Sequence, residues 1–169
     1  MSPPSSLLSP DLIALVDGGV SAIVSSCDAA LRPSIMRAVG STITPDGRSI
    51  TVYLSRRQSR QLLQDVAANG RIAVVFSEPS SHRTVQVKAA SVLTRSALPS
   101  DQPLLQRYLA AMQEKITEVG FDHAFTRAVL AYQLDDVVAI SFEPTQAFDQ
   151  TPGPKAGASL SAAAAGSAA

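Results

Sequence analysis

Cysteine and histidine are scarce in this chain, and each scarcity excludes a class of protein. The single cysteine, Cys27, excludes an internal disulfide framework, and tryptophan is absent. The two histidines, His82 and His123, lie too far apart for the ligand spacing of a structural zinc site. No histidine is near Cys27 in the sequence, so we interpret this residue as a small buried apolar side chain and not as a nucleophile.

An excess of charge of either sign is also missing. Lys plus Arg number 14 and Asp plus Glu number 14, so the formal net charge is zero. Nothing global therefore directs the chain to nucleic acid or to an anionic membrane, and any phosphate binding must be local. No apolar run approaches the roughly 20 residues that cross a bilayer, and residues 1–10 lack a cationic leader with an apolar run. We therefore expect a soluble protein of the cytoplasm.

The periodicity that is present indicates short strands with helices in a few places. Strands that follow one another through tight turns, without regular alternation with helices, favour an antiparallel barrel of the α+β class. The helical pattern predicts helices over residues 11–18, 59–68 and 103–120, with further helical turns over 122–130. The strand pattern predicts strands over residues 20–26, 33–41, 48–54, 71–76, 84–94 and 137–143.

Composition divides the chain near residue 150. We expect one domain with a few peripheral helices over residues 1–150, a length sufficient to bury a core. Residues 151–169 are rich in Pro, Gly and Ala and lack periodicity, which predicts a flexible tail that is disordered over about its last dozen residues.

The densest polar cluster covers residues 55–61, where a predicted strand gives way to a predicted helix. The cluster contains three arginines, although a helix start carries partial positive charge and prefers acidic side chains. Ser59 can cap the helix, and Arg60 can bind phosphate oxygens in a bidentate manner. The segment is therefore either an anion site at a helix N-terminus or a solvated basic loop.

Two predicted strands carry further polar candidates. Arg37 interrupts an apolar strand, where a charge either needs a partner or points outward. Thr84, Gln86 and Lys88 alternate with valines on one face of another strand. That face can contact the polar atoms of a ring, or it can be an ordinary half-exposed strand face.

The order of four short segments resembles the flavin-binding core of pyridoxamine 5′-phosphate oxidase-like proteins. The segments are Arg37-Ala38-Val39, Ser59-Arg60, residues 71–76 and Arg83-Thr84-Val85. The resemblance covers about residues 20–93 and rests on the order and spacing of the segments, while residues 148–154 look similar to the ending of uncharacterised members. It implies an antiparallel split β-barrel that binds FMN, and a homodimer with the flavin at the subunit interface.

Carried over to this sequence, the resemblance implies a set of cofactor-binding residues. Arg37 would face the phosphate, the backbone of residues 37–39 would lie near the flavin ring, and Ser59, Arg60 and Gln61 fall on a Ser-Arg-Lys phosphate motif. The complete set is Arg37, Ala38, Val39, Leu54, Ser55, Ser59, Arg60, Gln61, Thr84, Gln86 and Lys88.

The departures from the family pattern concern the reaction more than the cofactor. Gln61 replaces the motif lysine, residues 40–42 lack a lysine that serves flavin and substrate, and the C-terminal Arg-x-His substrate motif is absent. We therefore do not expect oxidation of pyridoxamine phosphate. A flavin-dependent oxidoreductase acting on an unidentified small molecule is the leading hypothesis. The alternatives are a flavin-storing protein without turnover and a split barrel that holds haem or a deazaflavin.

Overall fold

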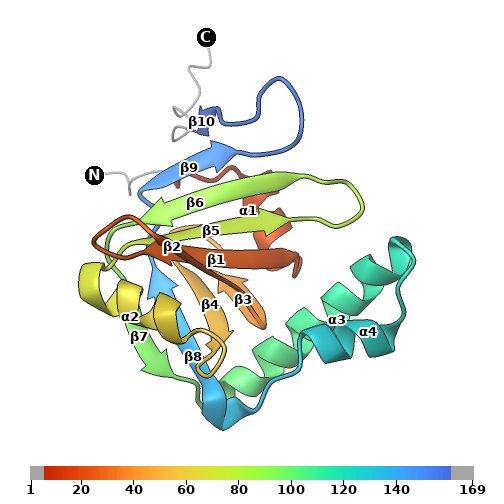
Figure 1. Cartoon of the computed structure of the whole chain (residues 1–169). Helices are drawn as coiled ribbons and strands as arrows, with labels where there is room; N and C mark the ends of the chain where they lie inside the picture. Colours follow the sequence, from red (N-terminus) through yellow and green to blue (C-terminus); the bar gives the residue numbers. More distant parts are fainter. Residues whose placement is uncertain (1–5, 161–169) are drawn as a thin grey trace.

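Two antiparallel sheets form the centre of the structure, a computed structural model that describes residues 6–160 (Figure 1). The larger sheet has the strand order β10-β9-β6-β5-β1-β2, and the smaller one has the order β3-β4-β8-β7. The strands of the larger sheet are β1 (Ser21–Cys27), β2 (Pro33–Arg37), β5 (Ile72–Ser77), β6 (Thr84–Ala89), β9 (Gln146–Asp149) and β10 (Ser159–Leu160). Those of the smaller sheet are β3 (Gly40–Ile43), β4 (Ile50–Ser55), β7 (Leu93–Ser96) and β8 (Val137–Phe142).

The chain passes from one sheet to the other without a break between β2 and β3. The amide of Ala38 donates to the carbonyl of Ala22 in the larger sheet, at 2.9 Å. The next amide, that of Val39, donates to the carbonyl of Tyr53 in the smaller sheet, at 2.8 Å. Two consecutive residues are thus bonded to different sheets, and this fixes how the sheets meet.

Two of the predicted strands are each divided between the sheets. The predicted strand over residues 33–41 becomes β2 and β3, and the one over 84–94 becomes β6 and β7. Strand alternation fails at the first crossing because Ala38 and Val39 are both buried, each against a different sheet. The antiparallel α+β class is confirmed, but the sheets do not form a closed barrel in the part of the chain that the structure describes.

Large apolar side chains from the inner faces of both sheets fill the space between them. In β5 the burial alternates strictly, with Val74 and Phe76 fully enclosed. The smaller sheet contributes Val52, Leu54 and Ile140, none of which retains exposed surface. Burying one such side chain stabilises the fold by about 1.5–3 kcal/mol, so this shared core is what holds the two sheets together.

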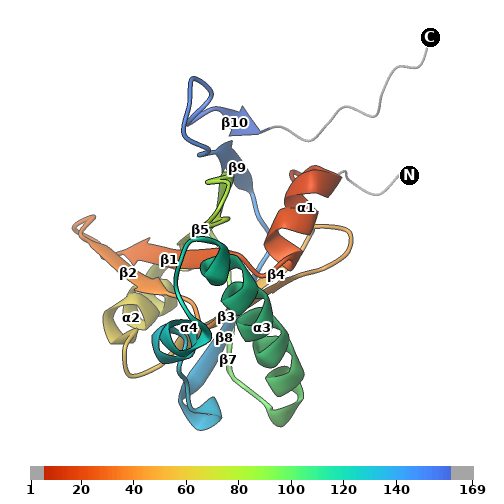
Figure 2. The same ribbon diagram turned by 90° about the vertical axis from the view of Figure 1, so that its right-hand side faces the viewer.

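In the described part of the chain, four α-helices lie around the sheets (Figure 2). Helix α1 (Pro10–Asp17) begins after the capping hydroxyl of Ser9, which accepts from the Leu12 amide, and it contacts β3. Helix α2 (Arg60–Asn69) packs on β1 and β2 and ends at Gly70, which has the left-handed φ of 69°. The other two are α3 (Gln102–Glu118), preceded by a 3-10 turn η1 (Pro99–Asp101), and α4 (His123–Val129), followed by η2 (Leu134–Asp136).

Helix α3 is anchored to both sheets. The buried Tyr108 hydroxyl donates to the carbonyl of Val20 at 2.7 Å, directly before β1. On β3, a Cβ added to Gly40 would lie 2.5 Å from a methyl carbon of Leu105, so the glycine allows the helix to approach. The predicted helix over residues 103–120 is therefore confirmed, and it covers β3.

The segment after residue 150 adds to the larger sheet. The short strand β10 pairs with β9, neither of which periodicity indicated, and both lengthen the sheet beyond β6. Residues 161–169, most of the predicted disordered end, lie outside the described residues. Within the described chain, no helix has the length and apolarity that a membrane span requires.

Candidate functional site

The start of helix α2 holds a buried hydroxyl without a partner. Ser59 precedes the first residue of the helix and is only 2% exposed. Its backbone, at φ −107° and ψ 21°, lies outside the usual cap conformation, and its side chain caps none of the helix amides. Among residues 6–160 the Ser59 Oγ has no hydrogen-bond partner. A buried polar atom left unpaired costs about 1–3 kcal/mol, which favours a ligand that bonds to it.

The first turn of α2 offers further donors for an anion. No backbone carbonyl of the described chain accepts from the amides of Arg60, Gln61 or Leu62. The first turn contains no acidic residue that would offset the partial positive charge of the helix start. Free amides, an orphaned hydroxyl and positive potential together make an anion-binding geometry.

Two of the nearby arginines are tied to Asp136, at the end of η2. The Arg57 Nε lies 3.4 Å from Asp136 Oδ1, and the Ser55 hydroxyl donates to Asp136 Oδ2 at 2.7 Å. The amide of Arg56 donates to the Asp136 carbonyl at 2.7 Å, while its guanidinium donates to the Ser96 hydroxyl at 3.0 Å. Asp136 thus holds the loop that leads into α2, and the Ser55 hydroxyl is one of the groups through which it does so.

Arg60 differs from these arginines because it is left available. Its side chain is exposed and has neither an ion-pair nor a hydrogen-bond partner among residues 6–160, whereas the Arg56 guanidinium, which also lacks a carboxylate, is bonded to Ser96. The adjacent Gln61 is exposed as well, but its amide donates to Asp65 Oδ1 at 2.9 Å. The free cation at the helix start is therefore Arg60.

Two contacts orient α2 along β2. The Ser34 hydroxyl donates to the buried Asp65 carboxylate at 2.6 Å, and the Asn69 side chain donates to the Cys27 carbonyl at 2.7 Å. From Asp65 back to Arg60 the helix rises about 7.5 Å, and from Ser34 to Arg37 the strand advances about 10 Å. The start of α2 therefore lies near the crossing from β2 to β3. This brings the predicted residues 37–39, 55 and 59–61 into one region.

Three predicted residues of this region belong to the core. Ala38 and Leu54 are fully buried and Val39 is 5% exposed. The amides of Ala38 and Val39 are also used in hydrogen bonds to the two sheets. Their part in the site is to fix the crossing, and their side chains and amides are not free for a ligand.

Arg37 points away from α2. Ser34, which faces α2, and Arg37 have opposite parity on β2, so their side chains lie on opposite faces of the larger sheet. Arg37 is exposed on the outer face, where its guanidinium donates to the Ser21 hydroxyl at 2.8 Å. Within one chain, its side chain and the start of α2 do not converge.

The predicted residues of β6 share the outer face with Arg37. The register places Arg37 opposite Ile23, Ile23 opposite Val75, and Val75 opposite Gln86. Three strand spacings, about 14 Å, therefore separate Arg37 from Gln86. Thr84 bonds to the His82 carbonyl at 2.8 Å, on the same face of β6. In one chain these β6 residues lie apart from the start of α2.

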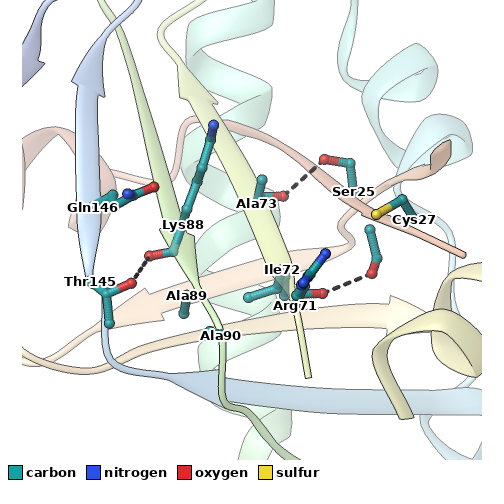
Figure 3. A pocket seen from close by; sticks show the side chains of 11 residues that line it. Ser25, Cys27, Arg71, Ile72, Ala73, Lys88, Ala89, Ala90, Thr145 and Gln146 are labelled. Carbon is teal, nitrogen blue, oxygen red and sulfur yellow. Dashed lines mark hydrogen bonds between the residues drawn. The ribbon is translucent and has the colours of Figure 1, made fainter. Parts of the chain in front are cut away.

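Lys88 borders a hollow of about 480 Å³ on this outer face (Figure 3). Its ammonium lies 4.8 Å from the centroid of the Phe148 ring. Arg71 and Cys27 also line the hollow, so Cys27 is half-buried at a cavity and is not the enclosed apolar residue we predicted. Sequence reasoning missed the hollow because only the strand register places these residues together.

A buried network supports the smaller sheet beside the crossing. Asp101 accepts from both guanidinium nitrogens of Arg95, at 2.6 and 2.8 Å, and from the Tyr53 hydroxyl at 3.0 Å. The Arg95 guanidinium is the main reason that the pKa of Asp101 falls to about 2, and burial raises the pKa of Tyr53 to about 12. Both groups keep one protonation state near neutral pH, which makes this network structural. The described residues contain no group of three His, Cys, Asp or Glu side chains suited to a metal ion.

Comparison with solved structures finds proteins of the same fold. A protein of Lactobacillus delbrueckii named as a candidate pyridoxamine 5′-phosphate oxidase superposes with a TM-score of 0.52, at 11% identity over 83% of this chain and 93% of that chain. An F420 reductase gives a TM-score of 0.53 at 13% identity, over 86% of this chain and 97% of that chain. HupZ of Group A Streptococcus superposes with a TM-score of 0.53 at 13% sequence identity. The match covers 89% of this chain and 99% of that chain.

The chain has the fold of these proteins. The resemblance to pyridoxamine 5′-phosphate oxidase-like proteins inferred from the sequence is thereby confirmed as a structural resemblance. No family model matches the sequence, and no curated protein does. At such low identity the likeness concerns the fold alone, so function must be argued from the site.

Proposed function

We propose that this chain is a split-barrel flavoprotein that binds FMN, with the phosphate at the start of α2. The observation that carries the proposal is the buried, unpaired hydroxyl of Ser59 beneath free helix amides. A phosphate supplies the acceptors that these groups lack, and it balances the positive end of the helix. The proposal accounts for an arrangement that otherwise destabilises the chain.

The residues at the start of α2 fit a phosphate group in charge and in hydrogen bonding. Ser59 would donate its hydroxyl proton, the amides of Arg60 and Gln61 would donate from the first turn, and the Arg60 guanidinium would bind two oxygens. Gln61 stands where the resembling family has a lysine, and its side chain is already bonded to Asp65. Among residues 6–160, Arg60 is therefore the cation at the start of α2 that we assign to the phosphate.

We further propose that a second copy of the chain completes the flavin cleft. Arg37 and Gln86 face outward from one sheet and lie too far apart to close around a ligand by themselves. Between and beside them lie apolar side chains, among which Ile35 is 65% exposed. A homodimer across this face would cover Ile35 and bring the outer residues of one copy to the helix start of the other.

The bound flavin would supply hydride or electron-pair chemistry, and the chain supplies position and electrostatics. No pair of titratable side chains near the start of α2 is arranged as a general acid and base, and we assign no catalytic residue there. We propose an oxidoreductase that acts on a small molecule. The likeness to an F420 reductase favours a deazaflavin as the second candidate cofactor.

The first experiment compares Arg60→Glu with Arg48→Glu, which changes an exposed arginine in the turn before β4. We expect the wild-type chain and Arg48→Glu to bind FMN with quenching of flavin fluorescence, and Arg60→Glu to lose most of that affinity. Equal affinity in all three proteins would show that the phosphate binds elsewhere. The absorption spectrum of the purified protein distinguishes flavin, deazaflavin and haem.

Turnover is tested separately from binding. The flavin-loaded protein is photoreduced without air, with EDTA as the electron donor, and its reoxidation by air and by added electron acceptors is followed by absorbance. Acceptor-dependent reoxidation faster than that of free FMN supports an oxidoreductase. Reoxidation no faster than that of free FMN with every acceptor supports storage of the flavin and contradicts the proposed activity.

A further inference from the structure

The hollow on the outer face of the larger sheet has a floor of small side chains. The register places Ser25 opposite Ala73, Ala73 opposite Lys88, and Lys88 opposite Gln146, so one row crosses four strands. Ser25 and Ala73 are short, whereas Lys88 and Gln146 rise beside them (Figure 3). The difference in side-chain length produces a hollow of about 480 Å³.

Two cations line this hollow without a counter-charge. Lys88 is opposite Ala73, so Arg71, two residues earlier on the same face, is its diagonal neighbour, with about 7–8 Å between such positions. None of the residues that line the hollow is acidic. Asp28, which follows Cys27 in the chain, is paired with Arg32 at 2.8 Å. The Lys88 ammonium lies over the Phe148 ring, and no carboxylate of the described residues pairs with it or with Arg71, so an anion in the hollow would meet two cations and no acid.

The remaining lining groups suit an organic anion better than a bare ion. The hydroxyls of Ser25 and Ser26 donate to the carbonyls of Ala73 and Arg71, at 3.3 and 2.8 Å, so they are already engaged. The Gln146 amide remains as a polar group at the rim, and the floor contributes the methyl group of Ala73. The hollow therefore offers two cations, one amide and a short apolar surface.

We propose that this hollow binds a small organic dianion, whose acidic groups are held by Arg71 and Lys88. Two cations and no acid in the lining match a ligand with a charge of minus two. The site is distinct from the start of α2, because the Asn69 side chain, at the other end of that helix, bonds to the carbonyl of Cys27 in the hollow. The ten residues of α2 span about 15 Å.

The test uses succinate as the probe and succinamide as its neutral counterpart. Titration calorimetry on the full chain, at constant ionic strength, should show binding of succinate and none of succinamide. Inorganic phosphate in a third titration distinguishes a site for any anion from one that requires two separated acidic groups. Absence of succinate binding to the wild-type chain would overturn the proposal.

Cys27 locates the binding, because it is the single cysteine of the chain and lines the hollow. Succinate should slow the reaction of this thiol with the neutral reagent N-ethylmaleimide, and succinamide should not. Succinate that binds in the calorimeter and leaves the labelling rate unchanged would place the ligand elsewhere and contradict the proposal.

Matched variants distinguish binding in the hollow from a general effect of the protein's charge. Arg71→Gln and Lys88→Gln should each weaken succinate binding about tenfold or more, because each removes a charge-assisted contact. Arg48→Gln removes an equal charge away from the hollow and should leave the affinity unchanged. Arg71→Gln should also retain FMN as the wild type does, which keeps this test independent of the flavin proposal. Equal succinate affinity in all variants would overturn the assignment.

Discussion

Ser59 is held in a position that costs the ligand-free chain stability, and we propose that its hydroxyl is kept for the FMN phosphate. Its hydroxyl is buried and unpaired within residues 6–160. We expect Ser59→Ala to leave the free energy of unfolding of the ligand-free chain unchanged or to raise it by up to about 1 kcal/mol, since the orphaned group is removed. The same change should weaken FMN binding about tenfold. Urea unfolding and a flavin titration measure the two effects.

Ser34→Ala is the matched control for this prediction. The Ser34 hydroxyl donates to the buried Asp65 carboxylate, so its removal should lower the free energy of unfolding by about 1–3 kcal/mol. The two serine-to-alanine changes should thus alter the free energy of unfolding in opposite directions or by very different amounts. If Ser59→Ala destabilises the free chain as much as Ser34→Ala does, the Ser59 hydroxyl has an internal role and is not kept for a ligand.

At this scale the sequence predicts local features and misses distant ones. Ser59 could be found because serine is favoured before a helix, although its hydroxyl does not cap the helix as we predicted, and Arg60 because a cation in the first turn departs from the charge preference of a helix start. Asp136 could not be found, because it reaches Ser55 across 81 positions and no local pattern marks it. Arg37 could be recognised as unusual, but the face on which it lies depends on the crossing that follows it.

Helices were predicted more accurately than strands because their ends carry local signals. Ser9 and Pro10 begin α1, and Gly70 ends α2, as capping preferences require. The strands over residues 33–41 and 84–94 were each predicted as one element, because side-chain alternation does not show that a chain changes sheets. Only the hydrogen bonds of Ala38 and Val39 reveal the first change.

The contact of η1 with β4 and β7 gives a prediction about pH. In the folded chain the pKa of Asp101 is about 2, below its ordinary value of 3.8, mainly because of the Arg95 guanidinium. A lowered pKa means that this carboxylate stabilises the fold above about pH 4 and loses the effect as the pH falls toward 2. Arg95 is half-exposed, so we expect Asp101→Asn to cost about 1–2 kcal/mol at pH 7, less than a fully buried pair.

The pH dependence separates this network from a simple loss of packing. The difference in free energy of unfolding between wild type and Asp101→Asn should shrink between pH 4 and pH 2, as followed by urea unfolding at each pH. Asp135→Asn, at an exposed position in η2, should show no such difference at any pH. A difference that stays constant down to pH 2 would mean that the charge of Asp101 contributes nothing.

At the scale of the whole molecule, the outer face of the larger sheet concentrates the features that one chain leaves open. Arg37, Gln86 and the hollow lined by Lys88 all lie on this face, together with the exposed Ile35. An apolar side chain exposed among polar ones is ordinary by itself. Ile35, however, lies beside residues that cannot form a flavin cleft within one chain. This position favours a second copy of the chain as the surface that buries Ile35.

The last prediction therefore concerns assembly. Ile35→Asp places a charge within the proposed interface and should convert the proposed dimer to a monomer in sedimentation velocity, with loss of FMN affinity. Leu93→Asp, in β7 of the other sheet, changes a side chain that is 78% exposed and should preserve both dimer and FMN affinity. A wild-type chain that binds FMN as a monomer would show that one copy builds the cleft. A dimer that survives Ile35→Asp would place the interface on another face, since an unpaired carboxylate buried in an interface is strongly unfavourable.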